Sequence, residues 1–106
     1  MDLRCRITTL RGAPALQVSG EVDLSTLPSF RDQLLRLVDD NVGCTVLVDV
    51  DGVTALDDAG LGMVLGAAGR ARQRGGDLSI VCTADHLLRR FAVTGLDRAV
   101  AVLPEG

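Results

Sequence analysis

The first quarter of the chain alternates apolar and polar residues with a period of two. The alternation covers residues 3–10 and 14–20, and residues 11–13 between them include a glycine that permits a turn. Because successive side chains of a strand point to opposite faces of a sheet, this pattern is typical of two half-buried strands. The chain is therefore expected to begin with a β-hairpin that ends at residues 21–23.

Apolar residues return at helical spacing in residues 24–40. The spacings i, i+3, i+7, i+10 and i+11 place all of these side chains on one side of a helix. Ser25 or Thr26 is the expected N-cap, and Pro28 is tolerated in the first turn. The pattern predicts an amphipathic helix whose buried stripe consists of Leu27, Phe30, Leu34, Leu37 and Val38.

Two further helices are expected. One starts at the aspartate pair of residues 57 and 58 and runs to about Arg74, where two glycines end it. The other covers residues 85–95, from an aspartate cap to a terminal glycine. Gly62, Gly66 and Gly69 lie inside the first of these helices, and each costs about 1 kcal/mol relative to alanine. Their small size favours close approach of a neighbouring element, so we expect tight internal packing at these glycines.

Three apolar runs without helical periodicity, at residues 44–50, 77–83 and 98–104, predict the remaining strands. The first is almost continuously aliphatic, which is typical of a central strand covered on both faces, and residues 51–56 are expected to connect it to the next helix. Helices between strands imply crossover connections. The expected fold class is α/β in the order β-β-α-β-α-β-α-β, with about three helices on a mixed sheet, in a single domain spanning residues 1–106.

Composition excludes several classes of function. Of the 106 residues 47% are hydrophobic and 24% charged, which is typical of a folded globular domain. All 11 basic residues are arginines, so lysine-dependent P-loops and Schiff-base chemistry are excluded. The net charge of −3 and the scattered arginines disfavour nucleic acid as a partner. No apolar run suits a membrane span or a signal peptide, so a cytoplasmic location without a membrane partner is expected.

The cysteines and the single histidine do not suggest a redox or metal site. Cys5, Cys44 and Cys82 lie in strand-like surroundings, and their odd number disfavours a disulfide framework. We expect them to be small core residues. His86 has no close-spaced ligand partner in the sequence. Neither a metal nor a cofactor is therefore expected.

The adjacent pair Asp57 and Asp58 precedes an apolar, glycine-rich run. One aspartate can cap the helix by accepting a hydrogen bond from its free N–H groups, and both gain from the helix dipole. Repulsion between adjacent carboxylates leaves the second one without a purely structural explanation. No nucleophile, histidine or ligand set accompanies the pair, so general acid–base catalysis is disfavoured and no enzymatic activity is expected.

Three motifs follow one another along the chain: GEVDLST at residues 20–26, DDAGLG at 57–62 and TGL at 94–96. In this order and spacing they resemble the STAS domain, and specifically the stand-alone anti-sigma factor antagonists of bacteria. The resemblance covers essentially the whole chain. It implies a protein-binding function, in which the dephosphorylated antagonist docks onto an anti-sigma factor, often a serine kinase, and frees the sigma factor. Phosphorylation of a serine in the family motif Asp-Ser-x-Gly blocks that docking.

By this resemblance the partner contacts lie around the start of the second helix. Leu61 and Met63 would be apolar anchors there unless the core buries them. Arg70, Arg72 and Arg74, at the far end of the helix, are expected to be a solvated helix end rather than a basic docking patch. The full set of residues expected to contact the partner is Glu21, Asp23, Thr26, Asp57, Asp58, Ala59, Gly60, Leu61, Gly62 and Met63.

The chain departs from the family motif at the phospho-acceptor position. Asp58 stands where the family carries serine, and Ala59 supplies no hydroxyl. A phosphoserine carries about −1.5 to −2 charges and three acceptor oxygens, whereas a carboxylate carries one negative charge and two oxygens. Asp58 is therefore expected to be an incomplete mimic of the phosphorylated state that a serine kinase cannot switch, or to face a partner adapted to an acid.

Two other functions remain open from the sequence. The chain could be a scaffold STAS subunit of a larger signalling complex, or a module that binds a small ligand or nucleotide, although no phosphate loop is visible. A weak homodimer is also left open.

Overall fold

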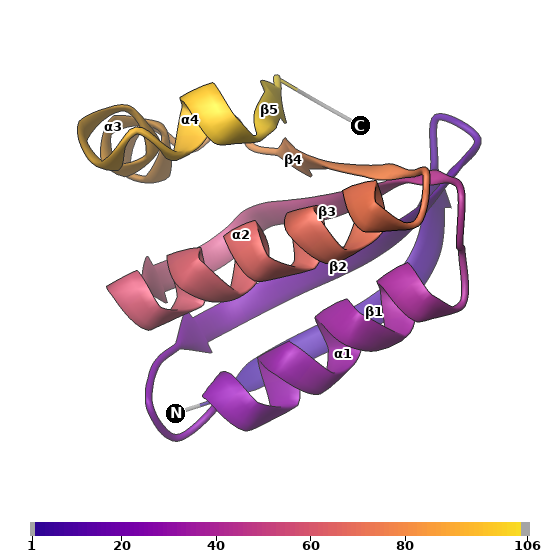
Figure 1. Cartoon of the computed structure of the whole chain (residues 1–106). Coiled ribbons are helices and arrows are strands. Elements are labelled where there is room, and N and C mark those ends of the chain that lie inside the picture. The colour runs from indigo at the N-terminus through magenta and orange to yellow at the C-terminus, as the bar shows by residue number, and fades with distance from the viewer. Residues whose placement is uncertain (1, 105–106) are drawn as a thin grey trace.

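A five-stranded sheet forms the centre of the computed structural model, which describes residues 2–104 (Figure 1). β1 pairs antiparallel with β2, and β3, β4 and β5 then follow in sequence order as parallel neighbours. The strands in these residues are β1 (Leu3–Leu10), β2 (Ala13–Val22), β3 (Thr45–Leu56), β4 (Asp77–Val81) and β5 (Ala101–Leu103). The helices in the same part of the chain are α1 (Leu27–Asp39), α2 (Asp58–Gln73), α3 (Asp85–Thr94) and α4 (Leu96–Ala99).

The helices pack on one face of the sheet. Each parallel connection moves to the next strand in the same direction, and right-handed crossovers in one direction place their helices on the same side. One apolar core contains side chains from every helix together with those of the central strand, for example Phe30, Val64, Phe91, Leu96 and Val48. The predicted mixed α/β sheet with β3 at its centre is confirmed. The expectation that β3 is covered on both faces holds only in part, because helices cover one face and on the other Leu47 is buried but Asp49 is half-buried.

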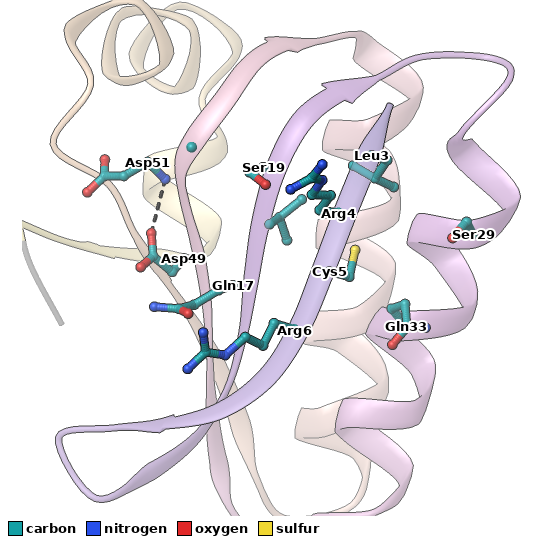
Figure 2. A pocket seen from close by; sticks show the side chains of 12 residues that line it. Leu3, Arg4, Cys5, Arg6, Gln17, Ser19, Ser29, Gln33, Asp49 and Asp51 are labelled. Atoms are coloured by element: carbon teal, nitrogen blue, oxygen red, sulfur yellow. Dashed lines mark hydrogen bonds between the residues drawn. The ribbon is translucent and has the colours of Figure 1, made fainter. Parts of the chain in front are cut away.

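The opposite face of the sheet is polar across its middle. Arg6, Gln17 and Asp49 occupy neighbouring positions on β1, β2 and β3, and Figure 2 shows them on the side away from α1 and α2. Nearer the β1–β2 turn, a small second apolar cluster buries Ala15 and Leu47. The burial of Leu47 outside the main core explains why the β3 sequence is almost continuously apolar although helices cover only one face.

Two element boundaries differ from the expectation. β3 continues to Leu56 because its last residues pair with the end of β2, where two register shifts keep the strands side by side. The run at residues 98–104 does not form one strand. It begins inside α4, where Leu96 is buried and its carbonyl accepts a hydrogen bond from the N–H of Val100, and β5 follows. This short fourth helix is the minor difference from the expected three.

The glycines inside α2 do not provide tight packing. A Cβ atom built at Gly62, Gly66 or Gly69 would meet no heavy atom within 4 Å. The expectation of close approach at these three positions is therefore wrong, because they border open space. The close approach occurs instead at Gly60, two residues before Gly62 and in the first turn of the helix.

The helix ends follow the predicted caps only in part. Gly95 ends α3 with φ of 80°, the left-handed conformation that favours glycine. Thr26 occupies the N-cap position of α1, but its side chain makes no capping bond. Asp85 is the first residue of α3 rather than its cap.

The three cysteines are all free thiols in the structure. Cys82 is buried and Cys5 is half-buried, and burial raises the pKa of both thiols. Cys44 is exposed just before β3, so the expectation of a core position is wrong for this residue.

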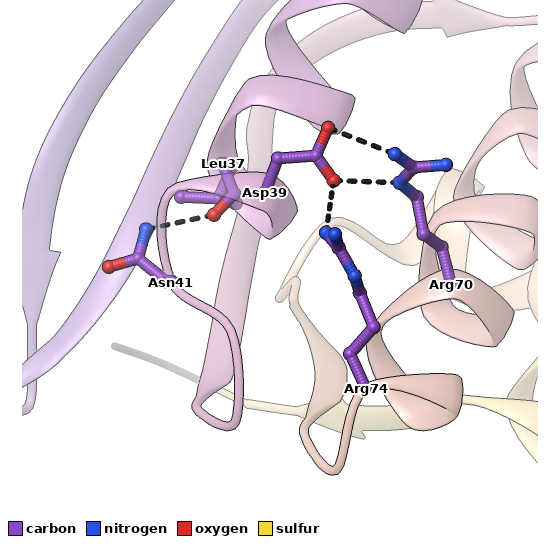
Figure 3. A network of polar contacts seen from close by, with 5 residues as sticks. All are labelled: Leu37, Asp39, Asn41, Arg70 and Arg74. Atoms are coloured by element: carbon purple, nitrogen blue, oxygen red, sulfur yellow. Dashed lines mark hydrogen bonds and ion pairs between the residues drawn. The ribbon is translucent and has the colours of Figure 1, made fainter.

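One carboxylate and two arginines join the C-terminal ends of α1 and α2 (Figure 3). Arg70 donates from Nε and Nη2 to the two Asp39 oxygens at 2.7 and 3.1 Å, and Arg74 Nη1 donates to Asp39 Oδ1 at 2.8 Å. The hydrogen bond from Arg70, above all, lowers the pKa of Asp39. Arg72 pairs with Asp77 at 2.9 Å. The three arginines are therefore paired within the chain rather than simply solvated.

Candidate docking surface at the start of α2

The C-terminal ends of β2 and β3 and the first turns of α1, α2 and α3 lie at the same end of the molecule (Figure 1). In open α/β sheets, ligands and partners are commonly met outside the carboxyl ends of the parallel strands. The residues singled out in the first two sequence motifs belong to this end. Their individual positions decide which of them a partner can reach.

Asp57 fixes where α2 begins. Its backbone N–H donates to the carbonyl of Val22 at 3.2 Å, which ties the end of β3 to the end of β2. Its side chain is the N-cap and accepts a hydrogen bond from the N–H of Gly60 at 3.0 Å. A carboxylate at this position satisfies one of the free N–H groups of the first turn and interacts favourably with the helix dipole. The capping prediction is confirmed for Asp57.

Gly60 lets the first turn of α2 lie directly on the sheet. A Cβ at this position would lie 2.5 Å from Leu56 Cδ1 and 2.9 Å from Val22 Cγ1. Both neighbours are buried in the core, so neither can move aside freely. The glycine therefore sets how close the Asp57–Asp58 pair lies to the ends of β2 and β3.

The loop between β2 and α1 is built around Asp23 and Thr26. Asp23 Oδ1 accepts hydrogen bonds from the hydroxyl of Ser25 at 2.7 Å and from the backbone N–H of Ser25 at 2.9 Å. The bond from the Ser25 hydroxyl is the main reason why the pKa of Asp23 is lowered. The Thr26 hydroxyl donates to the carbonyl of Glu21 at 2.8 Å and accepts from the N–H of Asp23 at 3.0 Å. Thr26 is thus a structural residue of the loop.

Asp58 points outward and pairs with an arginine of α3. Its side chain is 89% exposed, and Arg90 Nη2 donates to Asp58 Oδ1. The Arg90 side chain is only 34% exposed. One carboxylate oxygen of Asp58 has a partner while most of the group faces solvent. The charge at position 58 therefore remains accessible to another protein, although an internal arginine partly balances it.

A shallow hollow of about 510 Å³ joins these groups. Asp23, Asp57 and Asp58 line it together with His86 and Arg90 from α3. Three residues with carboxylates and one with a guanidinium thus border the same depression, whose surface is otherwise mainly apolar. Such an arrangement suits the recognition of a partner that carries positive charge or hydrogen-bond donors.

The structure brings only part of the predicted contact set to this hollow. Leu61 is 5% exposed and belongs to the core, so it is unavailable as an anchor. Met63 is half-buried and lies with Gly62 in a separate groove between α1 and α2. Ala59 is exposed next to Asp58. Glu21 contributes its backbone carbonyl to the bond with Thr26.

Sequence reasoning missed Arg90 and two exposed apolar side chains. Arg90 lies 32 residues from Asp58, and nothing in the local sequence indicates that α3 reaches the start of α2. Leu24 follows Asp23 and is 82% exposed, and Val93, one helical turn after Arg90, is 86% exposed. The apolar residue between Asp23 and Ser25 in GEVDLST was a visible signal for Leu24. We call Asp23, Leu24, Asp57, Asp58, Arg90 and Val93 the docking surface.

Within residues 2–104 no group of three or more histidine, cysteine, aspartate or glutamate side chains is arranged to hold a metal ion. Among the same residues no helix is both long and apolar enough to cross a membrane. The polar groups of the docking surface are carboxylates and one guanidinium, which can bind through ion pairs and hydrogen bonds.

Comparison with known proteins gives consistent matches. A family model described as "Mlab, STAS domain" matches residues 5–104. The anti-sigma-B factor antagonist of Listeria monocytogenes is 32% identical over 85 residues, which cover 80% of this chain and 74% of that protein.

Two solved structures share the fold. An anti-sigma factor antagonist from Mycobacterium paratuberculosis aligns with a TM-score of 0.85 and 22% identity, covering 97% of this chain and 86% of that one. The Bacillus cell fate determinant SpoIIAA in its phosphorylated form aligns with a TM-score of 0.69 and 17% identity, covering 96% and 93%. The family model and the Listeria relative extend this likeness from fold to family. The chain belongs to the STAS domain family, among the anti-sigma factor antagonists.

Proposed function

We propose that this protein binds an anti-sigma factor of the serine-kinase type through the docking surface and thereby controls the release of a sigma factor. In this proposal it acts in the cytoplasm as a binding protein and catalyses no reaction. Its relatives carry the name of anti-sigma factor antagonists, which supports a partner of this class. The finer claim concerns position 58, where a carboxylate replaces the phospho-acceptor serine of the family motif.

The observation that carries the proposal is the exposure of the Asp58 carboxylate at the start of α2. The group is 89% exposed, and Asp57 alone supplies the capping bond of the helix. Asp58 is therefore not needed as a cap, and its charge faces solvent. A charge held at a rigid helix start is well placed for recognition by another surface.

Asp58 gives this surface a permanent negative charge. The phosphorylated form of SpoIIAA is a protein of the same fold that carries phosphate. A carboxylate bears one negative charge and cannot be removed by a phosphatase or added by a kinase. Arg90 holds one of its oxygens and so limits its rotation. In the proposal the partner reads a fixed, oriented carboxylate instead of a switchable serine.

Leu24 and Val93 are the apolar anchors that the proposal assigns to the docking surface. Both are more than four-fifths exposed, and one lies beside Asp23 while the other lies one turn from Arg90. The centre of a protein interface is more apolar than its polar rim, so exposed apolar side chains beside charged groups suit such a centre. They replace Leu61 and Met63, which the structure places elsewhere.

A second candidate function is a STAS subunit of a larger signalling assembly. The lack of a hydroxyl at residues 58 and 59 favours it, because a constitutive subunit needs no phosphorylation switch. The two candidates predict different complexes. An antagonist forms a small complex with a kinase-like protein, whereas a scaffold subunit purifies in a particle of far larger mass.

The test is a capture experiment from the native cytosol with the whole chain as bait, followed by size measurement and identification of the recovered protein. A kinase-like anti-sigma factor in a small complex supports the proposal, and its absence with recovery of a large particle refutes it. The recovered kinase is then incubated with ATP and either the native protein or Asp58→Ser. Phosphate should enter position 58 of the variant only. Phosphorylation of the native chain would contradict the claim that it cannot be switched.

A further inference from the structure

The sheet face opposite the helices carries an ordered pattern of charge. Arg4 and Arg6 lie on β1, Gln17 and Ser19 on β2, and Asp49 on β3. The strand register places Arg6 beside Gln17 and Gln17 beside Asp49, so these three side chains form one row across the sheet. Ser19 pairs with Arg4 on one side and with a glycine of β3 on the other. The face is thus basic along β1, neutral along β2 and acidic along β3.

Arg4 and Arg6 are exposed and Asp49 is half-buried, and these charges are only weakly engaged within the chain. In the part of the chain that the structure describes, Arg4 and Arg6 have no ion-pair partner. Asp49 accepts one hydrogen bond, from the backbone N–H of Asp51. Figure 2 shows the two arginines extending from β1 over β2, with Asp49 on the far side of Gln17. A hollow of about 920 Å³ is lined by these residues and, around the edge of β1, by Ser29 and Gln33 of α1.

We infer that this face is the interface of a symmetric homodimer. A two-fold axis parallel to β2, lying between two stacked sheets, places β1 of each copy over β3 of the other. Arg6 then lies opposite Asp49 of the second copy, twice over, and the Gln17 amides meet near the axis. An interface of this kind is isologous, because the same patch serves both partners.

The dimensions of stacked sheets suit this pairing. Sheets that pack face to face lie about 10 Å apart, and a long arginine opposite a short aspartate spans such a gap. The same rotation leaves position along the strands unchanged. The half-buried Ala13 of β2 therefore meets its own copy at one end of the interface, and Leu10 of β1 lies over β3 of the second copy.

The charge pattern favours a second copy over other occupants. Nucleic acid is disfavoured because Asp49 and Asp51 share the face with the arginines and would repel phosphates. A face that is basic on one flank and acidic on the other is complementary to itself under the stated rotation. The interface lies on the side of the sheet away from α2, so each copy keeps its docking surface free.

Charge reversal tests the inference with two variants and their mixture, followed by sedimentation equilibrium of the full chain. The native protein should form dimers in a concentration-dependent manner, and high salt should weaken them. Arg6→Asp places two pairs of carboxylates opposite each other, and Asp49→Arg places two pairs of arginines opposite each other. Each variant alone should raise the dimer dissociation constant by roughly tenfold or more.

The equimolar mixture is the decisive arm. One copy of Arg6→Asp and one of Asp49→Arg restore opposite charges at both contacts, so the mixture should dimerise at least as well as the native protein. Native mass spectrometry should show one copy of each variant per dimer. Gln17→Arg, which brings two arginines together near the axis, should also be monomeric. Circular dichroism and thermal unfolding confirm that each variant is folded.

Three results would overturn the inference. The native protein could remain monomeric up to about 1 mM, a concentration at which even a weakly associating protein forms dimers. Both charge variants could dimerise as well as the native chain, which would assign the dimer to another surface such as the free edge of β1. The mixture could fail to dimerise although each variant is folded.

Discussion

The two ends of the α1–α2 layer use the same chemistry for opposite purposes. At the C-terminal end, Asp39 receives three hydrogen bonds from Arg70 and Arg74, and its side chain is 38% exposed. At the N-terminal end, Asp58 receives one hydrogen bond from Arg90 and is 89% exposed. A carboxylate surrounded by two arginines has little remaining capacity for an outside partner. A carboxylate held by one arginine is oriented but still available.

The ends also differ in what anchors them to the fold. The Asp39 contacts join two helices directly, so the carboxylate itself is the link. The Asp58 end is fixed by other groups, namely the Asp57 cap, the Gly60 contact with the sheet and the Thr26 hydroxyl. Ion pairs between helices therefore stabilise one end, whereas a helix cap, close packing and a loop hydrogen bond stabilise the other. We expect mutations to separate these two roles.

The largest stability effect is expected at Thr26. Thr26→Val keeps the shape of the side chain but leaves the Asp23 N–H and the Glu21 carbonyl without their partner. Each unsatisfied group costs about 1–3 kcal/mol, to the extent that water cannot replace the hydroxyl. Urea denaturation should show this loss of unfolding free energy. Thr26→Ser, which retains the hydroxyl, should lose much less, and equal losses in the two variants would contradict the assignment.

Gly60→Ala should come next. The added Cβ overlaps the buried side chains of Leu56 and Val22, and overpacking of this kind costs about 1–3 kcal/mol, offset by about 1 kcal/mol of helix propensity. Gly62→Ala is the matched control, because its Cβ meets open space. It should stabilise the protein by up to about 1 kcal/mol. Thermal unfolding that moves in the same direction for both variants would show that Gly60 has no packing role.

Asp39→Asn and Asp58→Asn compare the two ends directly. Asp39→Asn removes the charge that Arg70 and Arg74 share, so the thermal unfolding midpoint should fall. Asp58→Asn removes an exposed charge with one partner, and exposed pairs contribute little to stability. Its unfolding midpoint should stay within the error of the native value. A larger loss for Asp58→Asn would mean that Asp58, too, is chiefly structural.

Acid should reveal the smallest effect. The pKa of Asp39 is lowered by the hydrogen bond from Arg70, and the pKa of Asp77 is lowered by the Leu78 N–H and then by Arg72. A carboxylate with a lowered folded-state pKa stabilises the protein above its unfolded value of about 3.9, and this stability is lost as the pH falls through the folded value. Unfolding free energy should therefore decline below about pH 4. Asp39→Asn should flatten that decline.

Much of the fold could be predicted from the sequence because local pattern and topology agree. The hairpin, the α1 stripe from Leu27 to Val38 and the end of α3 at Gly95 all rest on period or turn chemistry that acts within a few residues. The coverage of β3 could not be predicted from its own residues, because the direction of the crossovers decides it. α4 was missed because its single turn lies inside an apolar run that also suits a strand.

The docking surface could be predicted from the sequence only where its residues are adjacent in one motif. Asp57 and Asp58 follow each other in the sequence, and their different roles are explained by the N-cap geometry. Arg90 could not be found, because its contact depends on how α3 packs beside α2. Leu61 and Met63 were expected to contact the partner. Helical periodicity instead places Leu61 in the core and Met63 in the groove beside α1.

The most direct test of the account is the affinity of the captured anti-sigma factor for the native protein and for Asp58→Asn, measured by isothermal titration calorimetry. Asp40→Asn is the control, since it removes an exposed charge at the opposite end of α1. We predict that Asp58→Asn changes the dissociation constant by roughly tenfold or more while Asp40→Asn leaves it unchanged. Equal affinities for all three proteins would contradict the claim that the partner reads the carboxylate at position 58.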